Sequence, residues 1–474
     1  MVAATGPAGS RARRRASRPL RRVLLLVAGA LLFASCAPAG LVPDAAGGTS
    51  TTGSAASTAP GLTATTAVTP STSASVTSTP TPTRPADPTP SGPQAWTPPA
   101  GASPFAFYNA PKAPAGSVHG TLLRYQQVGP VPGAQTGATL WRILYLTRSA
   151  TGTSVVGSGY VAVPAQAAPA GGYPVISWAH GSTGMAQACA PSLFSTTLPG
   201  GLRQLILAPY LATLVDHGYL VTAADYPGLG APGTLGYYSG PAEGFAVLDA
   251  IRAAQGLATW HASHTAVILG HSQGGHSALF AGQLAATYTP EQRIVGVVAA
   301  APVAWLTGIA GAANTTSAPL NSDLLLLVVS WSRTYPGLPL DKLLTPSAIA
   351  GIGQLTSMCD DAVTKAYLHT PSSAVFLPAA STNRMLDALG QANTPGAAPT
   401  KAPILIVQGS SDNEVPISDT TSFVNHLCAV QPDRVTYTIY HGASHDGVLT
   451  AAQSQILDWI ADRIAGKPAP SGCG

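Results

Sequence analysis

The sequence has few charged side chains, and they are unevenly distributed. Lys, Arg, Asp and Glu make up only 9% of the 474 residues, whereas 46% of the residues are hydrophobic. Residues 1–35 hold seven of the arginines and no acid, so removing them changes the formal net charge from +4 to −3. The excess of basic residues therefore belongs to the N-terminal segment alone. Nothing in the remaining composition indicates nucleic-acid binding, and we expect no nucleic acid among the partners.

Cysteine is also scarce, and no Cys-x-x-Cys pair occurs. The five cysteines are Cys36, Cys189, Cys359, Cys428 and Cys473. Closely spaced cysteines are the usual mark of a structural metal site, so their absence argues against one; we expect neither a metal nor an organic cofactor. In an exported protein the last four cysteines suit two disulfide bonds, and four cysteines allow three pairings.

The N-terminus lacks an apolar run long enough to cross a membrane. Its arginine-rich stretch is followed by an apolar run over residues 23–33, shorter than the about 20 residues that a transmembrane helix needs. Residues 1–35 are therefore typical of a signal peptide. They lead into Phe33-Ala34-Ser35-Cys36, which is similar to a bacterial lipobox except that Phe33 replaces the usual leucine. We expect an exported lipoprotein, held on the outer face of the cell membrane by a lipid on Cys36; ordinary signal cleavage and secretion is the alternative.

Residues 36–100 have almost no large apolar side chains and are rich in Ala, Thr, Ser, Pro and Gly. Such a segment cannot bury enough surface to offset its chain entropy, so we expect a disordered spacer. Residues 101–474 remain, which is enough for one large domain with a sizeable core.

This remaining part alternates between strand-like and helix-like segments. Runs at 121–129, 139–147 and 154–164 mix polar with apolar residues and indicate antiparallel strands. Short apolar runs then indicate buried strands at 173–178, 219–226, 265–269, 294–300, 403–408 and 435–440. A closing helix is expected over 447–464. Because strands that alternate with helices pair in parallel through right-handed crossovers, the sequence predicts an α/β fold with a mostly parallel, doubly wound sheet.

The segment Gly270-His271-Ser272-Gln273-Gly274 joins a strand-like run to a helix-like one. A serine on so tight a turn is held with its hydroxyl exposed at the top of the sheet, and Gly270 and Gly274 let the backbones approach. The turn also directs backbone N–H groups at the place where an oxyanion would form. Ser272 is therefore the candidate nucleophile, against the alternative of an incidental Gly-x-Ser-x-Gly in a chain with 50 glycines.

A serine nucleophile needs a histidine base and a carboxylate that orients it, and in hydrolases with this turn both follow the serine along the chain. Asp412 lies shortly after a buried strand, and we assign it this role; Glu414 and Asp419 are the competing acids. His445 lies in the loop after the last predicted strand and is the candidate base. His441 is its rival, but it stands directly at the strand end.

An oxyanion hole needs two donors. The first should be the backbone N–H of Gln273, the residue after the nucleophile. The second should come from the glycine-containing turn His180-Gly181-Ser182-Thr183-Gly184, through the N–H of Ser182 or Thr183. The alternative is a simple glycine-rich turn.

About 100 residues separate the strands predicted at 294–300 and 403–408, far more than the usual 2–6 residues of a connection. They include the strongly apolar run 324–329. We interpret residues of about 303–400 as a largely helical cap inserted over the mouth of the active site. A second domain with its own core is the alternative, and the absence of linker composition at either end argues against it.

These features together resemble the secretory lipase family of actinobacteria and yeasts, within the α/β-hydrolases. The resemblance covers most of residues 105–470 and rests on five stretches: 177–184, 225–230, 243–252, 270–275 and 409–416. It implies a Ser272–Asp412–His445 triad, a cap between the sixth and seventh core strands, and hydrolysis of carboxylic esters, including acylglycerols.

The resemblance also implies the pairing of the cysteines. Cys189 would bond to Cys359 and Cys428 to Cys473, and the second pair would brace the loop that carries His445.

The sequence thus predicts a serine hydrolase that cleaves carboxylic esters of fatty acids, with a lipid or ester as substrate and a lipid anchor as its membrane contact. A serine aminopeptidase or dipeptidyl peptidase could use the same triad, but it needs acidic residues to hold a free amine, and no such pair is evident beside Ser272. A non-catalytic surface-binding protein is the other alternative. The intact order of serine, aspartate and histidine argues against it.

Overall fold

The computed structural model describes residues 92–193, 210–314 and 318–473, with the side chains of 318–321 left aside. The expected signal peptide, Cys36 and nearly all of the expected spacer lie outside the described residues. Those described belong to one compact unit, Arg84–Gly474. Within them, no helix combines the length and the apolar character needed to span a bilayer.

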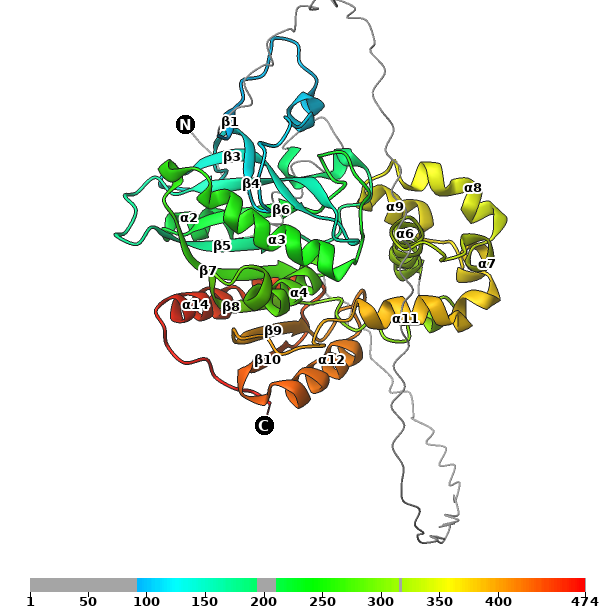
Figure 1. The fold of residues 1–474 in the computed structure, drawn as a ribbon. Coiled ribbons are helices and arrows are strands. Elements are labelled where there is room, and N and C mark those ends of the chain that lie inside the picture. Colours follow the sequence, from blue (N-terminus) through cyan, green and yellow to red (C-terminus); the bar gives the residue numbers. More distant parts are fainter. Residues whose placement is uncertain (1–91, 194–209, 315–317, 474) are drawn as a thin grey trace, which may run out of the picture. The chain divides into compact units, whose positions relative to one another are not determined.

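A sheet of ten strands forms the centre of this unit, in the order β1-β2-β3-β4-β6-β5-β7-β8-β9-β10 (Figure 1). The strands are β1 (Gln94–Ala95), β2 (Leu122–Pro130), β3 (Thr139–Arg148), β4 (Ser154–Val163), β5 (Tyr173–Ala179), β6 (Leu220–Asp225), β7 (Ala262–His271), β8 (Arg293–Ala300), β9 (Ile404–Gly409) and β10 (Val435–Tyr440). Strands β2, β3 and β4 are antiparallel, and β4 is antiparallel to β6. From β6 to β10 all neighbours are parallel, so the predicted α/β fold is confirmed.

The sheet begins earlier in the chain than residue 101, where the sequence placed the start of the domain. Gln94 and Ala95 pair in parallel with Arg124 and Tyr125 of β2. Trp96 then packs edge-on against Phe107, with ring centroids 5.5 Å apart. The expected boundary is therefore a few residues too late, because a strand of two residues carries no readable hydrophobic period.

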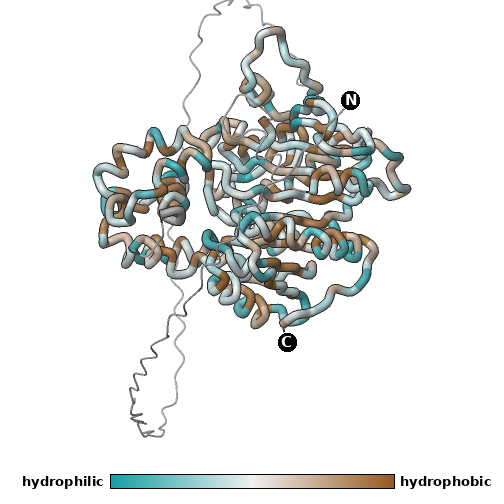
Figure 2. Tube along the Cα trace, turned by 180° about the vertical axis from the view of Figure 1, so that it is seen from behind, coloured by the Kyte–Doolittle hydropathy of each residue, from teal (hydrophilic) through white to brown (hydrophobic). Residues whose placement is uncertain are grey.

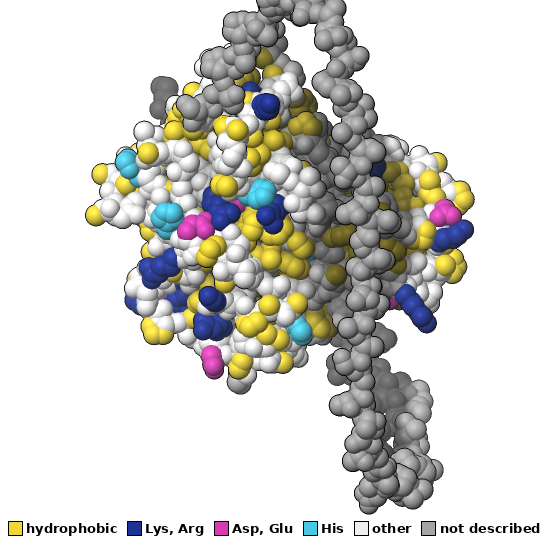
Figure 3. Space-filling model, in the orientation of Figure 1, with side chains coloured by type: hydrophobic (Ala, Val, Ile, Leu, Met, Phe, Trp, Pro, Cys, Tyr) yellow, Lys and Arg dark blue, Asp and Glu magenta, His cyan; other side chains and the backbone are white. Residues whose placement is uncertain are grey.

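Helices cover both faces of the sheet and enclose two apolar cores. One face packs against α3 (Gly240–Gln255), α4 (Gln273–Tyr288) and α12 (Ile417–Val430). The other packs against α2 (Leu211–Asp216), α13 (Gly447–Ala451) and α14 (Gln453–Ile464). The strands are buried between these layers, and Figure 2 shows hydrophobic residues concentrated along them. On the face shown in Figure 3, charged side chains are few and interrupted by apolar and neutral surface.

The order of the strands sets the place of a site. The chain runs from β5 outward to β6 and then returns to the other side of β5 as β7. The connections after β5 and β7 therefore leave from neighbouring strands and lie on opposite faces. In open α/β sheets the crevice at the carboxyl ends of such strands is where ligands bind.

The insertion between β8 and β9 is helical throughout its described elements. It contains α5 (Ile309–Ala312), α6 (Ala318–Thr334), α7 (Leu340–Leu343), α8 (Pro346–Leu355), α9 (Asp360–Tyr367), α10 (Ser372–Val375) and α11 (Arg384–Ala392). The apolar run 324–329 lies within α6 and is buried. Trp331 of the same helix donates its indole N–H to the carbonyl of Tyr237 at 2.9 Å, so α6 is anchored to the segment before α3.

Both disulfides that the resemblance implies are present. Cys189–Cys359 joins the segment after β5 to the start of α9, across 170 residues of sequence. Cys428–Cys473 joins α12 to the C-terminal tail. The tail lies along β10, where Gly472 donates its N–H to the carbonyl of Val435 at 2.8 Å. The first bond ties the insertion to the sheet, and the second holds the strand that leads to His445.

Candidate active site

Ser272 lies on a sharp turn between β7 and α4. Its backbone has φ 57° and ψ −120°, a region that residues with a side chain rarely adopt. Glycine is required on both sides of it. A Cβ on Gly270 would lie 2.0 Å from the carbonyl oxygen of Gly274, and a Cβ on Gly274 would lie 1.9 Å from that of Ala179 in β5. The strand and the helix thus approach as closely as the sequence predicts.

The backbone of Ser272 is held by three hydrogen bonds. Its N–H donates to the carbonyl of Ala300 at the end of β8, and its carbonyl accepts from the N–H groups of His276 and Val303. Among the described residues, its hydroxyl makes no hydrogen bond, and the residue lines a pocket. The side chain is therefore free to meet a substrate while its backbone is fixed.

Asp412 and His445 form the second part of the site. The Nδ1 of His445 lies 2.8 Å from Oδ2 of Asp412, and both side chains are buried. The N–H groups of Glu414 and Val415 donate to Oδ1 of Asp412 at 2.9 and 2.8 Å, and Gln408 donates to Oδ2. Both oxygens of the Asp412 carboxylate thus accept hydrogen bonds, and Oδ2 faces His445.

The competing residues are placed differently. Glu414 is 56% exposed, and its carboxylate lies 3.7 Å from Nε2 of His445, the nitrogen that a serine would need. Asp419 accepts a hydrogen bond from Ser418 and lines the pocket. His441 is exposed at the turn after β10. Of the candidates, only Asp412 and His445 make a hydrogen bond to each other.

This pairing shifts both pKa values. Burial raises the pKa of Asp412, but the hydrogen bond to His445, the charge of His445 and the backbone donors outweigh it and leave the pKa below its usual value. Burial lowers the pKa of His445. The hydrogen bond and charge of Asp412, together with the charges of Glu414 and Asp446, outweigh burial and leave the pKa above its usual value. Both shifts favour the charged pair, so Asp412 is suited to stabilise an imidazolium.

His271 links the turn at Ser272 to the histidine loop. Its Nε2 lies 3.1 Å from the carbonyl oxygen of His445, and the two rings are 4.6 Å apart. Burial and the charge of His445 lower the pKa of His271 to about 4. His271 is therefore neutral at ordinary pH and donates this bond from beneath the turn.

The turn after β5 lies against Ser272. A Cβ on Gly181 would be 3.6 Å from Cβ of Ser272. Within the described residues, neither Ser182 nor Thr183 donates its backbone N–H to another group, so both donors are available. The Ser182 hydroxyl bonds to that of Tyr237 at 2.6 Å. The carbonyl of Thr183 accepts from Asp360 of the insertion, which holds the turn in place.

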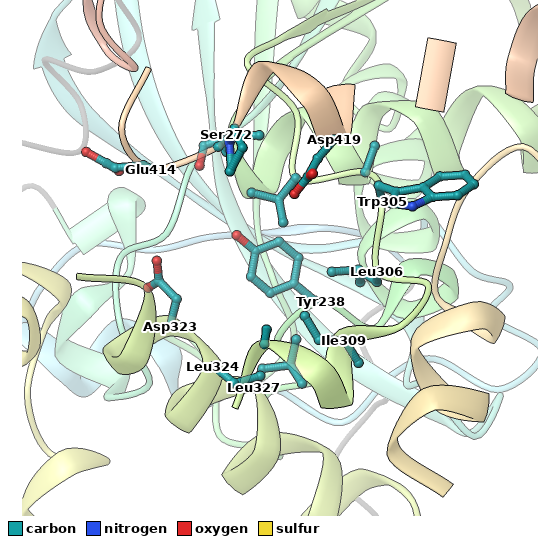
Figure 4. Close-up of a pocket in the computed structure, with 15 residues that line it drawn as sticks. Tyr238, Ser272, Trp305, Leu306, Ile309, Asp323, Leu324, Leu327, Glu414 and Asp419 are labelled. Atoms are coloured by element: carbon teal, nitrogen blue, oxygen red, sulfur yellow. The ribbon is translucent and has the colours of Figure 1, made fainter. Parts of the chain in front are cut away.

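Ser272 opens into a cavity of about 150 Å³ beneath the insertion (Figure 4). Most of its wall is apolar and comes from the segment after β8, from α5, from α6 and from the loop after Asp412: Val303, Ala304, Trp305, Leu306, Ile309, Ala312, Leu324, Leu327, Val415 and Pro416. The insertion thus supplies much of the surface around the serine.

Three carboxyl groups also line this pocket: Asp323 of α6, Glu414 and Asp419. Figure 4 shows Asp323 and Glu414 on one side of it, with Asp419 nearer Trp305. Burial, and then the charge of Glu414, raise the pKa of Asp323 to about 6. No acidic pair is evident beside Ser272 in the sequence, but the insertion brings Asp323 to the pocket from a distant part of the chain.

Glu243, to which the sequence alone assigns no role, lies fully buried directly below the turn and bonds to the side chain of Gln273 at 2.6 Å. The sequence signal that could have indicated this role is a single acid near the start of a mostly apolar helix.

One group of described side chains has the geometry to hold a metal ion. Ligand atoms of His271, His445 and Asp446 all lie within 4.8 Å of one another. His445 already uses Nδ1 for Asp412, so a metal here would occupy the nitrogen that a serine hydrolase needs as its base.

Known proteins with similar sequences are named as lipases. A protein of Mycobacterium tuberculosis (strain CDC 1551 / Oshkosh), named "Probable inactive lipase MT1628", is 29% identical over 388 residues, which cover 76% of this chain and 82% of that protein. "Secreted triacylglycerol lipase LIP4" of Malassezia globosa is 25% identical over 272 residues, 55% of this chain and 58% of that one.

Solved structures share the fold. Candida antarctica lipase A in its closed state has a TM-score of 0.68 at 21% identity and covers 78% of this chain and 88% of its own. The cell wall degrading esterase LipA of Xanthomonas oryzae has a TM-score of 0.61 at 19% identity, covering 73% and 100%.

The family itself follows from the sequence. The model of the secretory lipase family matches residues 204–472, which is more than half of the chain. The matched part includes Ser272, Asp412 and His445. This chain belongs to the secretory lipase family.

Proposed function

We propose that the protein hydrolyses carboxylic esters of fatty acids through Ser272, His445 and Asp412, by way of an acyl-enzyme. The hydrogen bond of 2.8 Å between Asp412 and His445, together with the pocket that Ser272 lines, carries this proposal. Family membership alone does not, since a relative is named a probable inactive lipase.

In the first half of the reaction His445 takes the proton of the Ser272 hydroxyl through Nε2 while the oxygen attacks the ester carbonyl. Asp412 holds the ring through Nδ1 and stabilises the imidazolium. The backbone N–H groups of Gln273 and of Ser182 or Thr183 stabilise the oxyanion. His445 then gives the proton to the leaving alcohol, which departs and leaves the acyl group on Ser272.

In the second half water replaces the alcohol. His445 takes a proton from the water, whose oxygen attacks the acyl carbonyl, and the same donors stabilise the second tetrahedral intermediate. When that intermediate collapses, His445 returns the proton to the Ser272 oxygen and the fatty acid leaves.

The apolar wall of the pocket supports a fatty-acyl substrate. Leu306, Ile309, Leu324 and Leu327 line the same pocket as Ser272, and we expect an acyl chain on Ser272 to pack against them. Each methylene buried there contributes about 0.8 kcal/mol, which is up to about fourfold in kcat/KM. Specificity for longer chains would therefore come from the insertion.

We expect kcat/KM for p-nitrophenyl esters to rise steeply from two carbons and to level off once the acyl chain outgrows the cavity. A series from two to sixteen carbons with the purified protein measures this. A flat series would mean that the acyl chain does not occupy this pocket. Absence of turnover at every length would overturn the proposed activity.

Asp323 and Glu414 favour one second candidate. A pair of acids beside the serine could bind the free amine of an aminopeptidase substrate. Apart from Asp419, Tyr238 and Ser272, the remaining wall is apolar, so we expect no hydrolysis of alanine p-nitroanilide under conditions where the esters are cleaved. Hydrolysis of the anilide by the unmodified protein, and its loss in Asp323→Asn, would favour the aminopeptidase function.

We also propose that the protein is anchored by a lipid on Cys36, on the basis of the lipobox-like sequence before it. Export itself accords with its membership of a secretory family. We expect Cys36→Ala to release the protein from the membrane fraction into the medium when it is expressed in a bacterium with lipoprotein processing. Unchanged membrane retention of the variant would exclude the anchor.

A further inference from the structure

Glu243, near the start of α3, is fully buried and accepts four hydrogen bonds. Its Oε1 accepts from the N–H of Tyr238 at 2.8 Å and from the side-chain amide of Gln273 at 2.6 Å. Its Oε2 lies 3.1 Å from Nδ1 of His276 and accepts from the Ser277 hydroxyl at 2.7 Å. A buried carboxylate is costly unless such partners compensate it, so this one is held in a single orientation.

His276 completes the arrangement and extends it to the insertion. Its Nε2 lies 2.8 Å from the carbonyl oxygen of Asn393, which directly follows α11. The ring of His276 is thus fixed between Glu243 of α3 and the end of the insertion. The side chain of Asn393 also accepts from the N–H of Gly240, the first residue of α3. The carboxylate of Glu243 on α3 thus binds α4 directly and, through His276, is linked to the end of the insertion.

Two of its bonds reach the reactive region directly. Gln273 is the residue whose backbone N–H is the proposed oxyanion donor, and Glu243 fixes its side chain. Tyr238 lines the pocket and has φ 52°, a strained conformation for a large side chain. Such a conformation persists only where the surroundings hold it. The bond from its N–H to Glu243 is part of what holds it.

We propose that Glu243 is a positioning residue for ester hydrolysis. It fixes the Gln273 donor of the oxyanion hole and the Tyr238 wall of the pocket, and it is itself held by His276 and Ser277. The inference rests on the proposed function, because it gives Glu243 a role in the step at Ser272.

Glu243→Met tests it, because methionine fills a similar volume but has no oxygen to accept from the four donors. The N–H of Tyr238 and the side-chain amide of Gln273 then lose their common acceptor. Loss of a whole oxyanion donor costs about 100- to 1,000-fold in kcat, so displacement of one should cost about 10- to 100-fold. We expect this fall in kcat for p-nitrophenyl butyrate with KM changed less than about threefold. Affinity for a trifluoromethyl ketone, which forms an oxyanion on Ser272, should fall by the same factor as kcat/KM.

Asp249→Asn is the matched control. Asp249 lies on the same helix, is also fully buried, and bonds to Tyr288 at 2.8 Å and Arg252 at 3.3 Å, away from Ser272. We expect this variant to lower Tm and leave kcat unchanged. Gln273→Met is the second test, used if Glu243→Met does not fold. It keeps the backbone donor and removes only the bond to Glu243, and it should also lower kcat.

Normal kcat in Glu243→Met, or in Gln273→Met if Glu243→Met does not fold, would overturn the inference. A fall in kcat without weaker binding of the ketone would overturn it as well. These results presuppose that the unmodified protein cleaves the ester. Absence of turnover by the unmodified protein would overturn the proposed function first and this inference with it.

Discussion

Ser272→Ala should lower kcat for p-nitrophenyl butyrate by about 10⁴- to 10⁶-fold and leave the fold intact. The hydroxyl makes no hydrogen bond with the described residues, so its loss removes the nucleophile without leaving a donor or acceptor unsatisfied. Turnover and circular dichroism of the two proteins measure this. Turnover within tenfold of the unmodified protein would show that another residue is the nucleophile.

A second substitution at position 272 tests whether the backbone of the turn is strained. Ser272 and an alanine in its place both keep φ near 57°, whereas glycine adopts this conformation without penalty. We therefore expect Ser272→Gly to be as inactive as Ser272→Ala but more stable by about 1 kcal/mol, which calorimetry would show as a higher Tm. A lower Tm for the glycine variant would mean that the turn is not strained.

Asp412→Asn should lower kcat by about 10⁴-fold. Two backbone N–H groups donate to Oδ1 of Asp412, so the oxygen of an asparagine is held there. Its amide nitrogen then takes the place of Oδ2 and donates to Nδ1 of His445. The proton of the neutral ring is forced onto Nε2, the nitrogen that must accept from Ser272.

The pH dependence of the same variant gives a second readout. His445 must be neutral to act as a base, and its pKa is raised above the usual value, so activity of the unmodified protein should fall as the pH drops through that raised pKa. Without the Asp412 carboxylate the pKa of His445 falls, and the residual activity should persist to lower pH.

Glu414→Gln is the control for the role of Asp412 and should change kcat less than tenfold. A larger loss in Glu414→Gln than in Asp412→Asn would move the orienting role to Glu414.

The sheet and the turn at Ser272 were readable because local patterns determine them. Buried parallel strands such as β7 and β9 are short apolar runs, and a serine between two glycines at a strand end is typical of a nucleophile turn. Local pattern also misled. The closing helix expected over 447–464 is instead α13 and α14, which separate at Ala452.

Contacts between distant segments could not be read in this way. The apolar run 324–329 indicates burial but does not indicate that α6 brings Asp323 into the pocket of Ser272. Glu243 and His276 are ordinary helix residues in sequence, and only the crossing of α3 with α4 makes them a buried pair. The sequence therefore identifies the reacting groups better than the residues that hold them.

Labelling with a fluorophosphonate, which reacts with activated serines, tests the central claim most directly. The unmodified protein would be treated and digested, and its peptides analysed by mass spectrometry, with ester turnover followed in the same sample. The expected result is one label per chain on Ser272, with turnover lost in parallel. Labelling of another serine, or persistent absence of label on Ser272, would contradict the assignment of Ser272 as an activated nucleophile.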